Sequence, residues 1–332
     1  MLSFIVLSWS ILGCDSYQET LDGPLSPADQ AEQSSDAMKQ DPNAQKYMNV
    51  VNLKAACAQT QAMNSCYRLG LHYFSGDDVL QDYRRAAILF DQTCRQGKPM
   101  ACGYLADMYT KGMGAKPDGN KAFPLHEKAC AGGIQKNCFM LGYSYLIGEG
   151  VDIDPTKAYS IFQKGCDNNY ALACMKLGDA HFHGENVESN PQKGVVFYKE
   201  ACKGDLIPAC SLLVQLYLDG QPSIDSESAY RSASKSCNQN VLLDCVRKAD
   251  LMVELGVAKN KPEVLLKSYQ RACNGREWTG CRKLGEIYFN GEFVTQNLPH
   301  SSLFFQRGCE GEDTISCNEL EKVKQIIFEQ SL

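Results

Sequence analysis

The chain has 332 residues, a formal net charge of −6 and 17 cysteines. A negative net charge without any run of Lys or Arg argues against a nucleic-acid partner. Sixteen of the cysteines form eight neighbouring pairs that recur about every thirty-six residues. A fixed period in this range is typical of a repeat array.

The first thirteen residues resemble a bacterial lipoprotein signal. The apolar run from Leu2 to Leu12 is too short to span a bilayer, which takes about 20 residues, and it has the length of a signal-peptide core. Residues 11–14 (Ile-Leu-Gly-Cys) resemble a lipobox, in which Cys14 would be lipidated and become the first mature residue. No Lys or Arg precedes the run, which leaves open an atypical signal, a start further upstream, or a buried N-terminal strand.

Residues 14–44 are rich in Asp, Gln, Ser, Ala and Pro and show no helical apolar stripe. This composition predicts a flexible polar tether that holds the following region away from a membrane surface. Asp15 matches the residue that marks inner-membrane retention in lipoproteins of enteric type, although the rule varies between bacteria. We expect an exported, lipid-anchored protein of the bacterial cell envelope, facing the periplasm or the cell surface.

Lipidation of Cys14 would leave sixteen cysteines, an even number, in a compartment where disulfides form. Zinc sites favour two to four residues between paired cysteines, whereas these pairs have seven or eight between them. No Cys-x-x-Cys-His haem attachment occurs either. We therefore expect no metal or other cofactor and predict the disulfides Cys57–Cys66, Cys94–Cys102, Cys130–Cys138, Cys166–Cys174, Cys202–Cys210, Cys237–Cys245, Cys273–Cys281 and Cys309–Cys317.

Each period predicts a pair of helices. In the unit that opens at Cys102, Leu105, Ala106 and Tyr109 share one helical stripe, and residues 122–129 form a second. Seven such pairs fit into residues 45–330, with capping helices at about 45–57 and 317–330, because end repeats lack a covering neighbour. The first helix should end at a glycine, which in six units is Gly76, Gly112, Gly148, Gly184, Gly220 or Gly291.

The predicted fold is all-α, an αα-superhelix (solenoid) of disulfide-linked helix pairs. In each pair, the first cysteine ends one second helix and the other opens the next first helix, which suits the 4.4 to 6.8 Å between Cα atoms of a disulfide. The unit from Cys245 to Cys273 departs from the pattern: Lys248 replaces Leu, Met252 replaces Tyr, and Gly256 is displaced by one residue. We expect that unit to be the most irregular.

The repeat resembles the Sel-like repeat, which is related to the tetratricopeptide repeat. The matching residues are Cys138, Leu141-Gly142, Tyr145, Gly148-Glu149-Gly150-Val151, Lys157-Ala158 and Cys166. The paired cysteines make the chain similar to the Helicobacter cysteine-rich proteins. That resemblance implies export, a superhelix of disulfide-linked helix pairs and, for some members, penicillin binding or weak β-lactam hydrolysis. In the wider repeat class it implies adaptor roles.

Enzymatic activity has little support in the residues. An acylating β-lactamase needs a Ser one helical turn before a Lys, with Ser-Asp-Asn and Lys-Thr-Gly elements. The chain has Ser232-Ala-Ser-Lys235 and neither of the other elements, so a solvated helix face is the alternative. A weak β-lactamase or penicillin binder, acting on a β-lactam or a cell-wall fragment, stays as a second hypothesis without assigned catalytic residues.

The histidines do not predict a metal site. His181 and His183 lie close together, but His181 occupies the slot that holds Tyr in five other units, which favours a packed structural residue. His72, His126 and His300 lie in different units and show no ligand spacing.

A binding scaffold is the preferred hypothesis. Arrays of helix pairs bind partners along the concave face, which the first helices line. By resemblance to tetratricopeptide arrays, the residues one and five after the helix-opening cysteine should point there. The alternative is that their aromatic rings only cover neighbouring helices. On the first hypothesis a protein or peptide of the envelope would contact Tyr67, Leu71, Phe139, Tyr143 and Met175.

Overall fold

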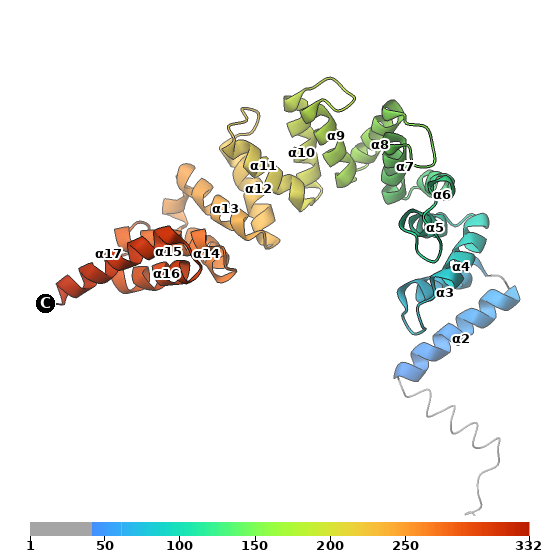
Figure 1. Cartoon of the computed structure of the whole chain (residues 1–332), viewed down its shortest axis with the longest axis horizontal. Helices are drawn as coiled ribbons and strands as arrows, with labels where there is room; N and C mark the ends of the chain where they lie inside the picture. Colours follow the sequence, from blue (N-terminus) through green and yellow to red (C-terminus); the bar gives the residue numbers. More distant parts are fainter. Residues whose placement is uncertain (1–41, 61, 332) are drawn as a thin grey trace, which may run out of the picture. The chain divides into compact units, whose positions relative to one another are not determined.

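The computed structural model describes residues 42–60 and 62–331, which form α-helices, one short 3-10 helix and no strand (Figure 1). The all-α prediction is confirmed. Seven first helices open the repeats: α3 (Met63–Ser75), α5 (Pro99–Lys111), α7 (Gln135–Ile147), α9 (Ala171–His183), α11 (Ile207–Leu218), α13 (Leu242–Glu254) and α15 (Trp278–Asn290). Seven second helices close them: α4 (Tyr83–Arg95), α6 (Gly119–Ala131), α8 (Pro155–Asp167), α10 (Pro191–Lys203), α12 (Ser226–Asn238), α14 (Pro262–Asn274) and α16 (Leu298–Glu310).

Two further helices flank the repeats. The leading helix α2 (Pro42–Thr60) begins three residues before the predicted one, and the closing helix α17 (Thr314–Gln330) also begins three residues early. The predicted signal peptide, Cys14 and the tether up to residue 41 lie outside the described residues. None of the helices in the described part of the chain is both long and apolar enough to cross a bilayer.

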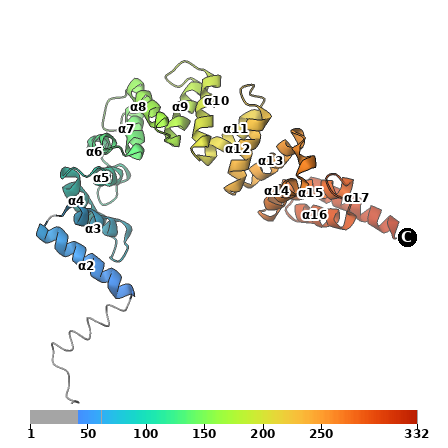
Figure 2. The ribbon, with the colours of Figure 1, turned by 180° about the vertical axis from the view of Figure 1, so that it is seen from behind.

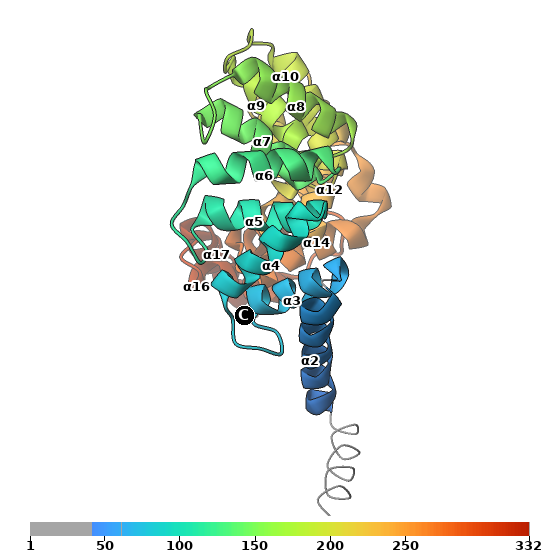
Figure 3. The same cartoon turned by 90° about the vertical axis from the view of Figure 1, so that its right-hand side faces the viewer.

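The chain divides into two compact units, with the boundary between Leu89 and Phe90 inside α4. In the first unit α2 packs against α3. In the second, every helix from α5 to α17 packs against the next along the chain. Figure 3 shows α5, α6 and α7 side by side in this stack, and Figure 2 shows the order continuing to α16. Contacts between chain neighbours define the predicted solenoid.

Close packing within a repeat depends on a small residue directly after the core Leu. In four repeats this residue is glycine, and in three of them an aromatic ring of the second helix rests on it. A Cβ at these glycines would lie 2.5 to 2.7 Å from the ring, which is shorter than a packed side chain allows. The three pairs are Gly142–Phe162, Gly178–Tyr198 and Gly285–Phe305.

Polar side chains and glycines set the helix ends. The first helix ends at a glycine with φ between 71° and 81° in five repeats, a left-handed conformation that other residues adopt at a cost. Most second helices begin at a side chain that accepts a backbone N–H of the first turn, which stabilises a helix by about 1 kcal/mol. These N-caps are Asp118, Asp154, Asn190, Asp225 and Asn297.

Eight disulfides join the repeats. Each joins the last turn of α2 or of a second helix to the first turn of the following helix, with Cα atoms 4.5 to 4.8 Å apart. The predicted fold class of disulfide-linked helix pairs is therefore confirmed. So many disulfides indicate an oxidising, extracytoplasmic compartment. The bonds are Cys57–Cys66, Cys94–Cys102, Cys130–Cys138, Cys166–Cys174, Cys202–Cys210, Cys237–Cys245, Cys273–Cys281 and Cys309–Cys317.

The sixth repeat is irregular, as expected. Its first helix α13 ends at Glu254, and the positive φ falls two residues later, at Gly256. The connection contains the 3-10 helix η1 (Val257–Asn260) in place of an extended loop. Lys261 then precedes α14 without forming a side-chain cap. This repeat has lost several of the local signals that the others share.

Candidate functional site

One stripe of the first helices carries exposed apolar side chains. Positions two before, five after and nine after the helix-opening cysteine fall within about 40° of one another around an α-helix. In α5, α7, α9 and α13 apolar residues at these positions are 36 to 50 % exposed. We call this stripe the first-helix face, and it comprises Met100, Tyr143, Ile147, Leu172 and Leu243.

The character of this stripe changes along the second unit. Exposed carboxylates lie directly after α11, at Asp219, and on α13, at Asp250 and Glu254. The hydroxyl of Tyr269 donates to Asp250 at 2.7 Å, and that of Tyr217 donates to Glu254. The nearby cation Arg247 is already engaged, because its guanidinium donates to Asp244 at 3.0 Å and to Gln215 at 2.6 Å. The stripe therefore carries exposed apolar side chains on α5, α7, α9 and α13, and exposed carboxylates at Asp219, Asp250 and Glu254.

The structure places the five predicted contact residues in different environments. Tyr143 is exposed, on the first-helix face. Phe139 is half-buried, with its ring centroid 5.3 Å from that of Phe162 and 6.0 Å from that of Tyr170, so it packs between repeats. Met175 packs against the core of its own unit. The other two, Tyr67 and Leu71, are half-buried on α3 in the first unit.

The residue directly after the helix-opening cysteine contacts the first helix of the next repeat. Ser211 Oγ donates to Oδ2 of Asp244 at 2.5 Å. Gly103 leaves room for Asn137, whose Oδ1 would lie 2.6 Å from a Cβ at that glycine. These positions vary between repeats because each residue fits the particular side chain that it contacts on the next first helix. The sequence analysis did not predict four exposed residues of this face as contacts, although helical periodicity places their positions beside that of Tyr143. They are Met100, Ile147, Leu172 and Leu243.

His126 forms a buried polar cluster in the second repeat. Its side chain is 1 % exposed, and its ring nitrogens lie 2.9 Å from Nδ2 of Asn137 and 3.2 Å from Oγ1 of Thr110. Burial lowers the pKa of His126 to about 4, with Asp107 opposing this effect and Lys136 adding to it. The cluster is structural, since the slot of His126 holds a buried ring in most other repeats, namely Phe90, Phe162, Tyr198, Tyr269 and Phe305.

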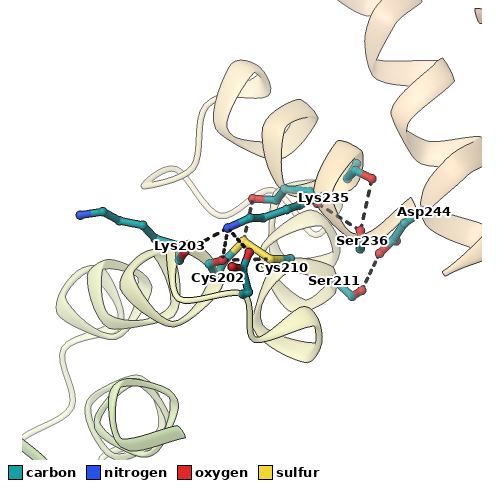
Figure 4. The surroundings of a disulfide bond; sticks show 10 residues. Cys202, Lys203, Cys210, Ser211, Lys235, Ser236 and Asp244 are labelled. Carbon is teal, nitrogen blue, oxygen red and sulfur yellow. Dashed lines mark hydrogen bonds and ion pairs between the residues drawn. A yellow bond between two sulfur atoms is a disulfide. The ribbon is translucent and has the colours of Figure 1, made fainter. Parts of the chain in front are cut away.

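The Ser-x-x-Lys tetrapeptide does not form a catalytic pair. Figure 4 shows Lys235 directed at the corner of the Cys202–Cys210 disulfide. Its Nζ donates to the carbonyl oxygens of Cys202 at 2.8 Å and Lys203 at 3.0 Å, and it lies 2.8 Å from a carboxylate oxygen of Asp205. Three oxygen acceptors suit a charged ammonium and not a general base. Lys235 binds the end of α10 to α12.

A cavity of about 590 Å³ lies beside this corner, between α10 and α12. Its basic side chains are already engaged. Two of them pair with a carboxylate on their own helix and a third, Lys235, with Asp205. The fourth donates to a carbonyl oxygen. These contacts are Lys203–Glu200, Arg231–Glu227, Lys235–Asp205 and Lys199 with the carbonyl of Ser223.

His181 packs against an aromatic ring, as its place in the repeat predicts. The ring of His181 stacks on Phe197 with centroids 5.6 Å apart and planes 8° apart. Burial lowers its pKa below the ordinary value, and Lys193 adds to this effect. Within the part of the chain that the structure describes, no three His, Cys, Asp or Glu side chains gather as a metal site would require.

These features define a class of protein: a disulfide-braced scaffold of stacked helix pairs. The chain belongs to the Sel1 repeat family, whose repeat model matches residues 64–98, 99–134, 138–170, 171–206 and 278–313, more than half of the sequence. The predicted resemblance to this family is confirmed. No curated protein matches the chain significantly.

A solved structure shares the fold. The chain is similar to a protective antigen present in uropathogenic Escherichia coli strains, with a TM-score of 0.57 and 20 % identity, over 86 % of this chain and 65 % of that one. It thus spans about two thirds of that relative's length. A Sel1 repeat protein from Oxalobacter formigenes matches with a TM-score of 0.48 and 18 % identity, over 85 % and 98 % of the two chains. Helicobacter pylori cysteine rich protein B matches with a TM-score of 0.32 and 24 % identity, over 41 % and 96 %.

Proposed function

We propose that this protein is an exported binding scaffold that holds a segment of another protein against the first-helix face. The observation that carries the proposal is the recurrence of exposed apolar side chains at equivalent helical positions in α5, α7, α9 and α13. Such recurrence exceeds what folding needs, because the core of each repeat is complete without these residues. Exposed apolar stripes on soluble proteins are typical of interaction sites.

The charges of the stripe specify the partner's chemistry. The apolar side chains of α5 to α9 suit a segment with Leu, Ile, Met or aromatic anchors. The carboxylates Asp219, Asp250 and Glu254, which follow on α11 and α13, suit Lys or Arg further along the same segment. We therefore infer a partner that combines apolar anchors at one end with basic residues at the other.

The proposed setting is the cell envelope. The eight disulfides support an oxidising compartment, and the sequence around Cys14 supports a lipid anchor at the start of the mature chain. A tether of about thirty residues would then let the repeats meet partners at some distance from the membrane. No contact among the described residues favours the second hypothesis, β-lactam hydrolysis.

Site-specific photo-crosslinking in intact cells tests the proposed surface. A crosslinking amino acid at Tyr143 should capture a discrete partner, and one at Val196, an exposed residue of the second helix α10, serves as the matched control. Mass spectrometry then identifies the captured segment. Equal yields and equal products at Tyr143 and Val196 would overturn the proposed surface.

Affinity measurements on the identified segment test its chemistry. The double variant Tyr143→Ala/Ile147→Ser should weaken binding at least tenfold, because it removes two adjacent exposed anchors. Asp219→Asn/Glu254→Gln should weaken it a few-fold at low salt and less at high salt. Unchanged affinity in both double variants would contradict the proposal.

A further inference from the structure

Lys248 occupies a core position. It lies on α13, three residues after Cys245, and is half-buried. A lysine there removes an apolar contact from the sixth repeat and brings an ammonium among second helices. Burying a charge is costly unless it is paired. The equivalent residues in six other repeats are apolar and buried, namely Leu69, Leu105, Leu141, Leu177, Leu213 and Leu284.

A cavity of about 880 Å³ lies beside Lys248. It is formed by α12, α13 and α14, and Lys248, Lys267 and Arg271 all line it. Glu263 is the one acidic residue in its lining. Polar side chains that donate hydrogen bonds complete the lining at Asn238, Gln270 and Asn274.

The cations of this cavity lack carboxylate partners. Within residues 49–59 and 62–331, neither Lys248 nor Lys267 forms an ion pair. Arg271 donates to two uncharged acceptors, the carbonyl oxygen of Asn238 at 3.3 Å and Oδ1 of Asn240 at 2.7 Å. Burial lowers the pKa of Lys248, and the positive charge of Arg271 lowers it further. The neighbouring cavity between α10 and α12 differs, because its four cations already have acceptors.

We propose that the cavity around Lys248 binds a phosphate group. An anion there would supply the missing counter-charge, and a phosphate dianion balances the net charge of three cations and one carboxylate. Arg271 provides the planar donor pair that matches phosphate oxygens, and the lysines act as point charges. The site is separate from the first-helix face, because α12 and α14 supply most of its lining and none of its lining residues belongs to that face. Its failure would leave the binding-scaffold proposal untouched.

Titration of the oxidised full chain with inorganic phosphate and pyrophosphate tests this site. Lys248→Leu restores the leucine of the other repeats, so the variant should fold and should bind pyrophosphate at least tenfold more weakly. Lys248→Arg keeps the charge and should retain most of the affinity. Lys116→Leu, which removes an exposed lysine of the α5–α6 connection, is the control for loss of one charge. Circular dichroism confirms that each variant is folded.

Two further arms separate the sources of phosphate. Vesicles of phosphatidylglycerol and of phosphatidylcholine test whether the group belongs to an anionic lipid, and free pyrophosphate tests a soluble ligand. Binding in either arm that depends on Lys248 supports the site and identifies its source. In addition, the amine resonance of ¹³C-methylated Lys248 should titrate at higher pH when ligand is bound. Absence of binding in all arms, or binding that Lys248→Leu leaves unchanged, would overturn the proposal.

Discussion

Two repeats of this protein carry a polar side chain in a slot that other repeats fill with an apolar one. In the second repeat, His126 replaces a buried aromatic ring, and its two ring nitrogens meet Asn137 and Thr110. In the sixth, Lys248 takes the place of a buried leucine and forms no ion pair with a carboxylate among the residues that the structure describes.

The difference between the two repeats shows how a residue that departs from the repeat pattern for structural reasons can be told from one that departs for functional reasons. A polar group in a repeat core is structural when neighbouring residues have changed to satisfy it, as Asn137 and Gly103 have around His126. We interpret a polar group that has no partner and lies beside a cavity as part of a binding site for a ligand that the chain itself does not supply. Repeat arrays allow this test because each position can be compared with the equivalent positions of the other repeats.

Reduction of the disulfides should have the largest effect on folding, since the second and the sixth repeat are both held by disulfides at their ends. Each bond closes a loop of about nine residues, for which chain entropy gives about 2.5 kcal/mol. With eight bonds lost, we expect much of the helical circular dichroism to disappear and both local environments with it. Tris(2-carboxyethyl)phosphine at neutral pH is a suitable reductant. Unchanged ellipticity and melting after full reduction would contradict this expectation.

Acid should affect the two repeats differently. His126 has a folded pKa of about 4, below its ordinary value of 6.5, so the unfolded chain takes up a proton first as the pH falls. The stability from this residue is complete above about pH 7 and is lost between pH 6.5 and 4, by about 3 kcal/mol in all. Tyr269 fills the equivalent slot of the sixth repeat and has no ring nitrogen that could take up a proton.

Urea denaturation between pH 7.5 and pH 4.5 measures the effect of acid. The variant His126→Phe places in this slot the ring found in other repeats. Its stability relative to the wild type should rise as the pH falls, and any constant cost of leaving Asn137 unpaired cancels in that comparison. A stability difference that does not change with pH would show that His126 is not buried in its neutral form.

Exchange of the helix caps should have the smallest effect. The second helix of the His126 repeat begins at Asp118, which accepts the backbone N–H of Lys121 at 3.2 Å. That of the sixth repeat begins at Lys261, which caps nothing but has a φ of −140°, close to the −144° of the capping residue Asp154. We expect Asp118→Ala to destabilise and Lys261→Asp to stabilise by about 1 kcal/mol each. Urea midpoints measure both, and changes of the same sign would contradict the capping argument.

The cysteine period made most of the fold predictable. It predicted the helix pairs, the place of the eight disulfides, the irregular sixth repeat and the glycine that ends the first helix in five repeats. The prediction was wrong for Gly220, because α11 ends at Leu218 and Asp219 is its C-cap. These are features of one repeat seen several times, so each position is supported by its equivalents. The closing helix began three residues earlier than predicted, because it starts three residues before Cys317, as the first helices start three residues before their own cysteines.

The binding surface was less predictable, because it depends on contacts between unlike residues. Phe139 and Tyr143 are both aromatic and lie one helical turn apart, yet only Phe139 packs against the next repeat, through Tyr170. The sequence also identified Lys248 as a departure from the pattern. It gave no indication of the cavity, since that depends on which side chains of α12 and α14 surround it.

The spacing within each cysteine pair also bears on how the chain is made. The partner of every bridged cysteine lies only eight or nine residues away, and no bridge encloses another. During the export that we propose, each pair would therefore emerge almost together, ahead of the next one. Oxidation can proceed in order from the first pair to the last, and the nearest thiol is always the native one. The array can mature vectorially, with little need for disulfide isomerisation.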